Sequence, residues 1–324
     1  MQTKTKKVVL SDESGMPQSV CKKNKKGLRG KDDLVKLGMC VIPLIKILVF
    51  SYLPMIGLII AFERYVPRKM FFSPWVGFKN FKVIFATDDF FILIKNAIVM
   101  NLLHVVLGTI VCVSLALFMH QMVNKIGLRI TQTIVMFPIF LSWALVAMLV
   151  KAIFGLDGVL TDAIHRLFNV KVEFYNKPEA WPLILTLVRV WKTAGFSAVI
   201  NYTVLLGVDK QIYEAAEIDG ASRFHQMRYI SIPSLKYMII IDLIMVMGNV
   251  LKTDFEMNFF IIGAETQLYE HVDVLESYMY RALMNASNFS TPVAMGLFQG
   301  VIGLILSYAA NRIVKRVDKA AALY

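Results

Sequence analysis

Six long apolar blocks divide this chain, and they constrain its fold more than any other feature. They cover approximately residues 38–62, 96–120, 130–154, 181–207, 236–252 and 291–312. A helix needs about 20 apolar residues to cross the hydrocarbon core of a bilayer. Hydrophobic residues make up 57% of the 324 residues and charged residues 18%, whereas soluble domains are about half apolar and about a quarter charged. The chain is therefore predicted to be an all-α polytopic membrane protein with about six transmembrane helices.

The fifth block is the weakest of the six, because it is short and carries Asp242 and Asn249. Two interpretations stay open. The fifth span is kinked, or it continues into the apolar stretch at 259–262.

The distribution of charge predicts the orientation of the chain. With the N-terminus in the cytosol, the inner segments are 1–37, 121–129, 208–236 and the end from 311, and they hold 20 basic against 9 acidic residues. The outer segments, 63–95, 151–180 and 251–290, hold 12 against 13. Basic residues gather on the cytosolic side of membrane proteins. We therefore expect a multi-pass protein of the cell (plasma or inner) membrane with cytosolic termini, a basic tail at 1–37 and a transmembrane domain at 38–320.

The sequence lacks the features that mark several other classes of function. The net charge of +12 is not gathered on one soluble face, so a nucleic-acid partner is not indicated. Cys21, Cys40 and Cys112 are isolated, which indicates neither a disulfide framework nor a zinc site. The chain has no G-x-x-x-x-G-K-[ST] phosphate loop, so it does not bind ATP by that motif. We expect no metal, no cofactor and no catalytic residues.

A polar stretch at 209–234 separates the fourth block from the fifth. Its pattern predicts two short helices. Asp209 can cap the first, and Gly220 can end it because glycine tolerates the left-handed conformation at a helix C-terminus. Ser222 can cap the second, and Pro233 is expected to close the loop before the next apolar run. A helical hairpin of this kind at a membrane surface is a docking element.

The spacing within this stretch resembles the EAA loop of the membrane subunits of ATP-binding cassette (ABC) importers, written EAA-x3-G-x9-I-x-L-P. Ile232 replaces the usual Leu and keeps the apolar character. Several matched positions between two spans argue against a chance tripeptide. The resemblance implies that the loop couples the chain to an ATPase. The implied coupling residues are Glu214, Ala215, Ala216, Asp219, Gly220, Ala221, Ile230 and Pro233.

Other stretches resemble the LplB-like branch of oligosaccharide importer permeases. They include SPWVGFKNF at 73–81, QTIVMFPIFLSWAL at 132–145, Trp191-Lys192, and segments around Asp273 to Arg281 and Val293 to Phe298. The sequence departs from that branch at Ile139, where His is usual, and at Gly263-Ala264, where Asn-Pro is common. Both departures fall in the predicted outer half, so they bear on substrate and partner.

The resemblance implies a type I ABC importer permease fold and a division of labour. The chain would form half of a path for oligosaccharides, beside a second, homologous permease subunit. A cytosolic ATPase dimer would supply the energy, so the chain itself would not be an enzyme. An extracytoplasmic solute-binding protein would deliver the substrate, and membrane lipid would surround the spans.

Ionisable groups inside a span usually face a cavity or a partner. Lys46 lies near the inner end of its span and can snorkel. Arg189, Lys192 and Phe196 share one helical face, and at 1.5 Å per residue Lys192 and Asn249 lie at about the same depth. These four residues, Arg189, Lys192, Phe196 and Asn249, are the candidates for the substrate path. Two alternatives stay open: Lys192 hydrogen-bonds a neighbouring span or subunit, and Arg189 forms a structural ion pair with Asp254 or Glu256.

Rival classes are less well supported by the sequence. A membrane-embedded enzyme needs catalytic groups at one depth, and no such cluster is present. An ion-coupled secondary transporter often carries several intramembrane carboxylates, whereas Asp242 is alone and near the inner surface. An ABC permease for a non-sugar solute is the remaining alternative.

Overall fold

The computed structural model describes residues 31–69, 72–86, 89–285 and 289–317. These residues are almost entirely helical, and the one β pairing among them is an isolated antiparallel bridge between Glu63 and Trp75. Most of the expected tail at 1–37 and the end of the expected membrane domain at 320 lie outside the described residues. The chain divides into two units, residues 1–57 and residues 58–324.

The first unit carries one apolar helix. Helix α1 (Lys31–Ile47) continues through a π-helical turn (Leu48–Tyr52) into a 3-10 helix (Leu53–Phe62). The π-turn ends two residues before Pro54. A proline has no N–H to donate, and its ring crowds the carbonyl of the residue four positions earlier, here Phe50, so a regular α-helix is disfavoured at this point. Residues Leu37–Phe62 are long and apolar enough to cross a membrane, in agreement with the predicted span 38–62.

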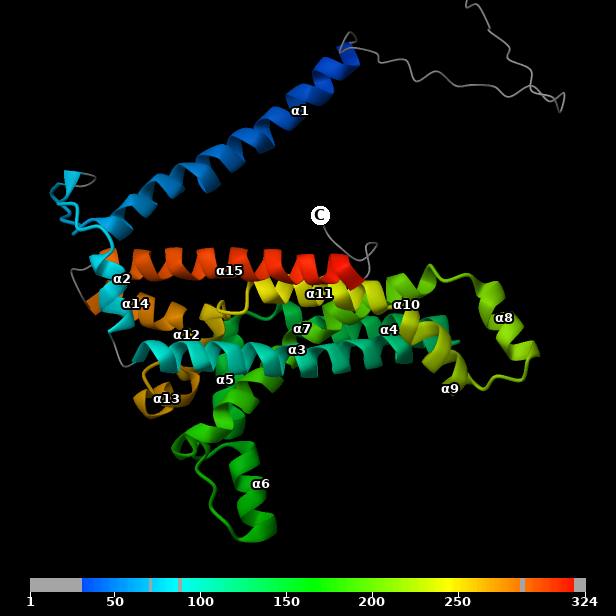
Figure 1. Ribbon diagram of the computed structural model, residues 1–324. Helices are drawn as coiled ribbons and strands as arrows, with labels where there is room; N and C mark the ends of the chain where they lie inside the picture. The colour runs from blue at the N-terminus through cyan, green and yellow to red at the C-terminus, as the bar shows by residue number, and fades with distance from the viewer. Residues whose placement is uncertain (1–30, 70–71, 87–88, 286–288, 318–324) are drawn as a thin grey trace, which may run out of the picture. The chain divides into compact units, whose positions relative to one another are not determined.

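The second unit is built on helices that pack lengthwise. Helix α3 (Asp89–Gln121) lies along α7 (Trp181–Leu206), and α11 (Lys236–Gly248) lies along α15 (Ser290–Val317) (Figure 1). In the described part of the chain, five helices are long and apolar enough to cross a membrane, and a bent pair makes a sixth if it counts as one span. This agrees with the prediction of about six spans.

The third predicted span, 130–154, is not one continuous helix. Helix α4 (Lys125–Met136) leads into a short 3-10 segment, η4 (Phe137–Phe140), and α5 (Trp143–Phe154) follows. Pro138 cannot extend an α-helix, and Ser142 starts α5 by accepting a hydrogen bond from the N–H of Leu145 at 3.3 Å. The continuous apolar run therefore gave no sign of this break, and only Pro138 and Ser142 in the sequence were consistent with it.

The fifth predicted span, 236–252, holds one helix, α11, and a bend separates it from the helical residues before it. Residues Arg223–Ser234 and Lys236–Gly248 form two helical parts at 48° to each other. Helix α11 then ends at Gly248, and the next helix, α12 (Phe255–Ile262), starts only after a non-helical segment at 249–254. The apolar FFII stretch thus belongs to a separate helix.

Two close helix contacts depend on glycine. A Cβ on Gly303 in α15 would lie 2.4 Å from the carbonyl oxygen of Gly248 in α11, and a Cβ on Gly195 in α7 would lie 1.9 Å from that of Val135 in α4. Both distances are far below van der Waals contact. Small residues let membrane helices approach to the backbone, so these glycines set how closely the two pairs pack.

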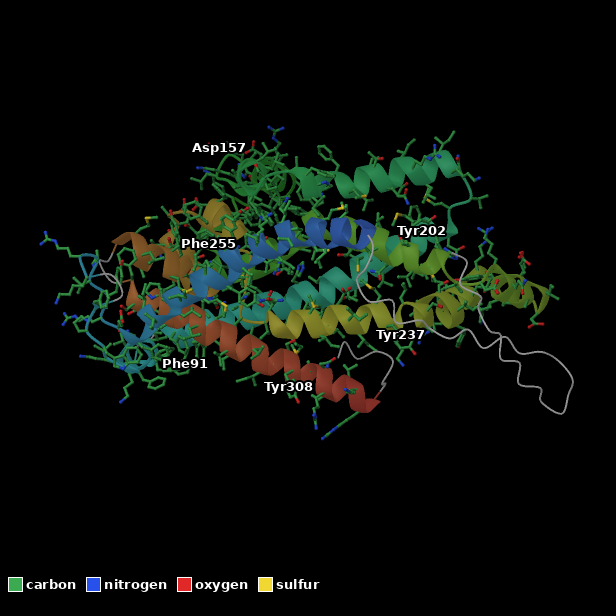
Figure 2. All side chains as sticks on the ribbon, turned by 90° about the horizontal axis from the view of Figure 1, so that it is seen from above. Phe91, Asp157, Tyr202, Tyr237, Phe255 and Tyr308 are labelled. Atoms are coloured by element: carbon green, nitrogen blue, oxygen red, sulfur yellow. The ribbon has the colours of Figure 1, made fainter. Side chains whose placement is uncertain are left out.

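Shorter helices complete the second unit. Figure 2 shows Tyr202 and Tyr237 toward one end of the bundle and Phe91 and Phe255 toward the other. The remaining helical segments are α2 (Lys79–Phe85), α6 (Val159–Phe168), η5 (Phe174–Asn176), η6 (Pro178–Ala180), η8 (Thr266–Leu268), α13 (Tyr269–Val272) and α14 (Leu275–Asn285).

Candidate functional site

A helical hairpin extends from one end of the bundle, between α7 and α11 (Figure 1). Its first arm is α8 (Lys210–Ile218). Asp209 caps this arm by accepting a hydrogen bond from the N–H of Gln211 at 3.0 Å. Gly220 ends it with φ +80°, and the N–H of the next residue, Ala221, donates to the carbonyl of Ala216 at 2.9 Å. The predicted cap and the predicted left-handed glycine are confirmed.

The second arm of the hairpin is longer than the sequence suggests. It starts at α9 (Arg223–Gln226), where Ser222 accepts a hydrogen bond from the N–H of His225 at 3.4 Å. The helix then widens into a π-helical segment, η7 (Met227–Ser231), and continues as α10 (Ile232–Ser234). Pro233 was expected to close the loop, and this is wrong. It lies inside the helical second arm, two residues after the π-helical segment ends, and the arm itself ends at Ser234.

The hairpin presents an exposed surface of mixed character. Glu214 on α8 is exposed, and so are two large apolar side chains, Ile218 at 87% and Phe224 at 67%. Monomeric soluble surfaces seldom group large exposed apolar side chains without a function. Of the other predicted coupling residues, Ala215, Asp219 and Pro233 are exposed and Ala216, Ala221 and Ile230 are half-buried.

A cavity of about 780 Å³ opens between α3, α7, α11 and the non-helical segment that follows α11. Its wall combines apolar side chains with charged and amide groups. The charged and amide side chains in it are Asn101, Arg189, Asp242, Asn249, Lys252, Asp254 and Glu256. A cavity with hydrogen-bonding groups of both signs can bind a polyhydroxylated solute or hold a column of water.

Asn101 organises one wall of this cavity. It is 4% exposed, and its Nδ2 donates to the carbonyls of Val250 at 2.8 Å and Lys252 at 2.9 Å. Its Oδ1 accepts a hydrogen bond from Arg189 Nη1 at 3.0 Å. One amide therefore joins α3, α7 and the break after α11.

Two further side chains hold the same break. Gln299 on α15 donates to the carbonyl of Leu251 and, at 2.7 Å, to Glu276 Oε1. The carboxylate of Glu276 also accepts hydrogen bonds from the N–H and hydroxyl of Thr253, at 3.2 and 3.0 Å. Irregular backbone at membrane depth persists only where its polar groups have protein partners or line a cavity. The segment at 249–254 meets both conditions.

The four predicted path residues separate into two pairs. Arg189 and Asn249 line the cavity, while Lys192 and Phe196 are not among the residues that line it. Lys192 is buried, and its Nζ donates to the carbonyls of Pro138 at 3.4 Å, Ile139 at 3.1 Å and Leu141. Phe196 is 47% exposed. Lys192 thus matches the alternative that it bonds a neighbouring span, and it stabilises the break between α4 and α5.

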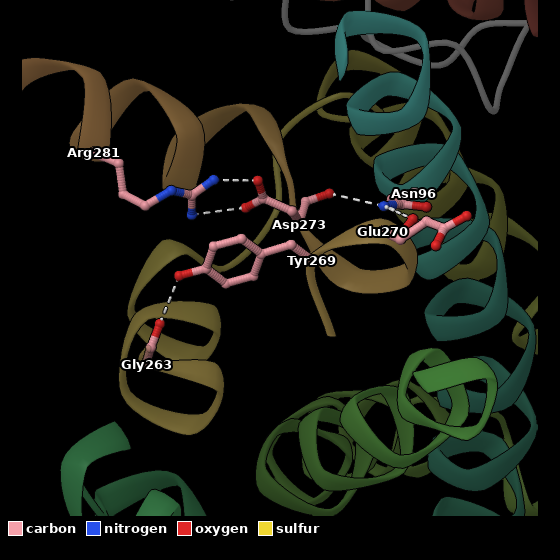
Figure 3. A network of polar contacts seen from close by, with 6 residues as sticks. All are labelled: Asn96, Gly263, Tyr269, Glu270, Asp273 and Arg281. Carbon is pink, nitrogen blue, oxygen red and sulfur yellow. Dashed lines mark hydrogen bonds and ion pairs between the residues drawn. The ribbon is translucent and has the colours of Figure 1, made fainter. Parts of the chain in front are cut away.

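A second polar network lies at the end of the bundle opposite the hairpin (Figures 1 and 3). Arg281 on α14 forms a two-pronged ion pair with Asp273, and its guanidinium lies 4.2 Å from the ring centre of Tyr269. Asn96 donates to the carbonyls of Glu270 and Asp273, both at 3.1 Å. Burial raises the pKa of the Asp273 carboxyl, and the hydrogen bond and charge of Arg281 oppose that shift. The network fastens the loop before α14 to α3.

Comparison with known proteins identifies the family. Residues 104–322 match the family described as binding-protein-dependent transport system inner membrane component. The chain belongs to this family. The permease is 34% identical to the polygalacturonan/rhamnogalacturonan transport system permease protein YteP of Bacillus subtilis (strain 168), over 83% of this chain and 84% of that protein. It is 32% identical to protein LplB of the same organism, over 87% and 89%.

Solved structures agree with this assignment. The permease aligns with a TM-score of 0.80 and 29% identity to a chain of a bacterial ABC transporter involved in the import of the acidic polysaccharide alginate, over 89% of this chain and 97% of that one. A second structure, of the alginate transporter in complex with an alginate pentasaccharide-bound periplasmic protein, aligns equally well. The predicted family and permease fold are confirmed, and the family is one of transport subunits rather than enzymes.

Sequence reasoning missed the residues that hold the cavity wall: Asn101, Glu276 and Gln299. The candidates taken from the sequence were ionisable groups inside the spans, together with Phe196 on the same helical face and Asn249 at the same depth. Asn101 and Gln299 are amides in long apolar helices, and that pattern was visible in the sequence. The carbonyls they bind belong to a helix break that the hydropathy pattern did not show.

Proposed function

We propose that the permease is the membrane subunit of an ATP-driven importer of oligosaccharides, and that its hairpin docks a cytosolic ATPase. The geometry of the hairpin carries the proposal. It combines an exposed carboxylate, Glu214, with exposed apolar side chains, Ile218 and Phe224, around a rigid turn at Gly220. Such a surface suits a groove with apolar walls and a basic rim. With the hairpin in the cytosol, the two termini are cytosolic as well.

Further partners complete the proposed assembly. A second, homologous permease would supply the other half of the path, a dimer of ATPase subunits would drive it, and a solute-binding protein would deliver the substrate. The family description supports dependence on a binding protein. The carbohydrate class is supported by the relatives, which are named for polygalacturonan and rhamnogalacturonan transport and for alginate import.

The cavity is the proposed substrate path within this half. Arg189 and Asn249 line it and can donate hydrogen bonds to sugar hydroxyls or to a uronate carboxylate. Lys192 and Phe196 do not line the cavity and are therefore not part of the proposed path.

Uptake measurements test the function. Cells that express the complete importer are given labelled fragments of polygalacturonan, rhamnogalacturonan or alginate. We expect uptake to continue when ion gradients are collapsed and ATP is maintained. Uptake that stops with the gradients would indicate an ion-coupled carrier, and uptake of none of these sugars would indicate a different solute.

The docking assignment has its own test. We expect Glu214→Lys to leave the permease inserted and paired with its partner while the ATPase no longer co-purifies. Labelling of single cysteines tests the sidedness: Gln226→Cys should react only from the cytosol, and Lys79→Cys, Glu173→Cys and Glu265→Cys only from outside. Lys319, the other predicted inside position, lies outside the described residues.

A further inference from the structure

Tyr213 lies on the inner side of the hairpin, one residue before the exposed Glu214. Its side chain is half-buried, whereas Glu214 and Ala215 beside it are exposed. This alternation places the docking surface and the bundle-facing surface on opposite sides of α8. Tyr213 contacts both the second arm of the hairpin and α3.

The first contact joins the two arms of the hairpin. The hydroxyls of Tyr213 and Ser231 are hydrogen-bonded at 3.0 Å. Ser231 is fully buried at the end of the π-helical segment η7, directly before α10 in the second arm. A buried hydroxyl without a partner is costly, so this bond fixes where α8 lies against the second arm.

The second contact joins α8 to a membrane span. The ring of Tyr213 packs on the imidazole of His120, with ring centres 5.4 Å apart and an interplanar angle of 48°. His120 lies in the last turn of α3, and Asn101 lies 19 residues earlier on the same helix, about 28 Å along its axis. One uninterrupted helix therefore connects the ring under Tyr213 with the wall of the cavity.

The second arm is embedded at the same place. Leu235 is fully buried in a cluster with Met119 of α3 and Leu205 of α7, and Met227 and Ile232 pack against that cluster. The second arm is thus packed into the base of the bundle. Tyr213 gives the first arm, which carries the docking surface, a fixed position on the same base.

We propose that Tyr213 is a positioning residue that makes α8 follow α3, so that displacement of the docked hairpin reaches the cavity wall. This inference rests on the proposed docking function. A rigid element shared by two sites is the physical basis for such coupling. The docking surface itself does not include Tyr213, so docking and coupling are separable.

The test compares docking with the ATP-driven change in the cavity. A cysteine at Met245, an exposed position in the cavity wall, is labelled with a membrane-impermeant thiol reagent after Cys21, Cys40 and Cys112 are replaced by serine. Labelling rates are compared between the nucleotide-free complex and the complex trapped with ATP and vanadate. This readout needs no knowledge of the sugar.

Tyr213→Phe removes the hydroxyl and keeps the ring. We expect the ATPase to co-purify as with the wild type, while the ATP-dependent change in labelling rate shrinks by about three- to tenfold, the range set by one ordinary hydrogen bond. Ser231→Ala should have the same effect, and the double variant should be no worse than either single one. Tyr237→Phe, the same chemical change at the start of α11, is the matched control and should behave as wild type.

Each outcome bears on one claim. An unchanged labelling response in both Tyr213→Phe and Ser231→Ala would overturn the positioning role, as would an additive double variant. Loss of ATPase binding in Tyr213→Phe would also overturn it, because Tyr213 would then belong to the docking surface. A wild-type complex with no response to ATP, or an ATPase that still docks on Glu214→Lys, would instead contradict the proposed function.

Discussion

Asn101 on α3 and Arg189 on α7 are joined by a 3.0 Å hydrogen bond from Arg189 Nη1 to Asn101 Oδ1. The same amide donates to two carbonyls of the break after α11. A single buried side chain therefore sets the relative positions of three walls of the cavity. The hydrogen bond to Asn101 orients the guanidinium of Arg189 in the cavity wall even without a bound ligand.

Replacing this amide should loosen the cavity wall. Asn101→Leu leaves the carbonyls of Val250 and Lys252 and the guanidinium of Arg189 without their partner. We expect a loss of about 2–4 kcal/mol in the free energy of unfolding, measured by thermal unfolding in detergent. Ser114→Ala is the control on the same helix, because that hydroxyl bonds only the carbonyl of Ile110 one turn earlier. Equal stability of the two variants would contradict the organising role of Asn101.

Gly220 should tolerate no branched side chain, although the space around it is open. Its φ is +80° and no atom lies within 4 Å of a Cβ placed there. The cost of Gly220→Val is therefore backbone strain, about 1–2 kcal/mol, which the turn relieves by tilting one arm. We expect ATPase co-purification to fall severalfold while insertion is normal. Gly300→Val, also in open space but within α15, should keep full docking.

Lys192 and Asn249 should differ in what their loss changes. Lys192→Met removes a buried cation from three carbonyls and from Trp143, whose ring centre is 5.1 Å away. We expect about 2–4 kcal/mol of lost stability and poor assembly. Asn249 is exposed, and its Nδ2 bonds the carbonyl of Met245 in its own helix. Asn249→Ala should keep stability within about 0.5 kcal/mol while uptake falls.

The opposite pattern would reverse the assignment. Normal stability with lost uptake in Lys192→Met would return Lys192 to the path. Unchanged uptake of every tested sugar in Asn249→Ala would remove Asn249 from it.

The crossing of α11 and α15 should be sensitive to one methyl group. Gly303→Ala places a Cβ 2.4 Å from the carbonyl oxygen of Gly248, and backbone cannot move aside as a side chain can. We expect a loss of about 1–3 kcal/mol, read from the detergent unfolding midpoint. Gly300→Ala, three residues earlier with nothing within 4 Å of its Cβ, should be neutral or slightly stabilising.

Loss of the ion pair at the end opposite the hairpin should make stability depend on pH. Arg281→Met leaves Asp273 buried without its cation, so the pKa of that carboxyl rises further above its ordinary value. The folded state then binds a proton more tightly than the unfolded state does, and stability falls as pH rises through the raised pKa. We expect Arg281→Met to lose about 1–3 kcal/mol at neutral pH and to recover much of it in acid. The double variant with Asp273→Asn should show little of this pH dependence.

The class, the family and the hairpin were readable from the sequence because each depends on local features. Spans follow from the lengths of the apolar blocks, since hydrophobic burial in lipid needs no partner residue. The caps at Asp209 and Ser222 and the left-handed Gly220 follow from backbone geometry within a few residues. The continued helix through Pro233 was missed, because a proline inside a regular α-helix is unfavourable and the sequence did not show the π-helical segment η7 that precedes it.

The tertiary structure decided which polar residues face the cavity. Helical periodicity put Arg189, Lys192 and Phe196 on one face, yet Arg189 reaches Asn101 and Lys192 reaches carbonyls released by the break at Pro138. Lysine and arginine side chains are long enough to reach any of several hydrogen-bond acceptors that lie several ångströms apart. That choice depends on where another helix exposes unpaired carbonyls, and a hydropathy pattern contains no information about helix breaks in three dimensions. The sequence by itself determined the spans, the family and the hairpin turn, while packing between helices decided the cavity.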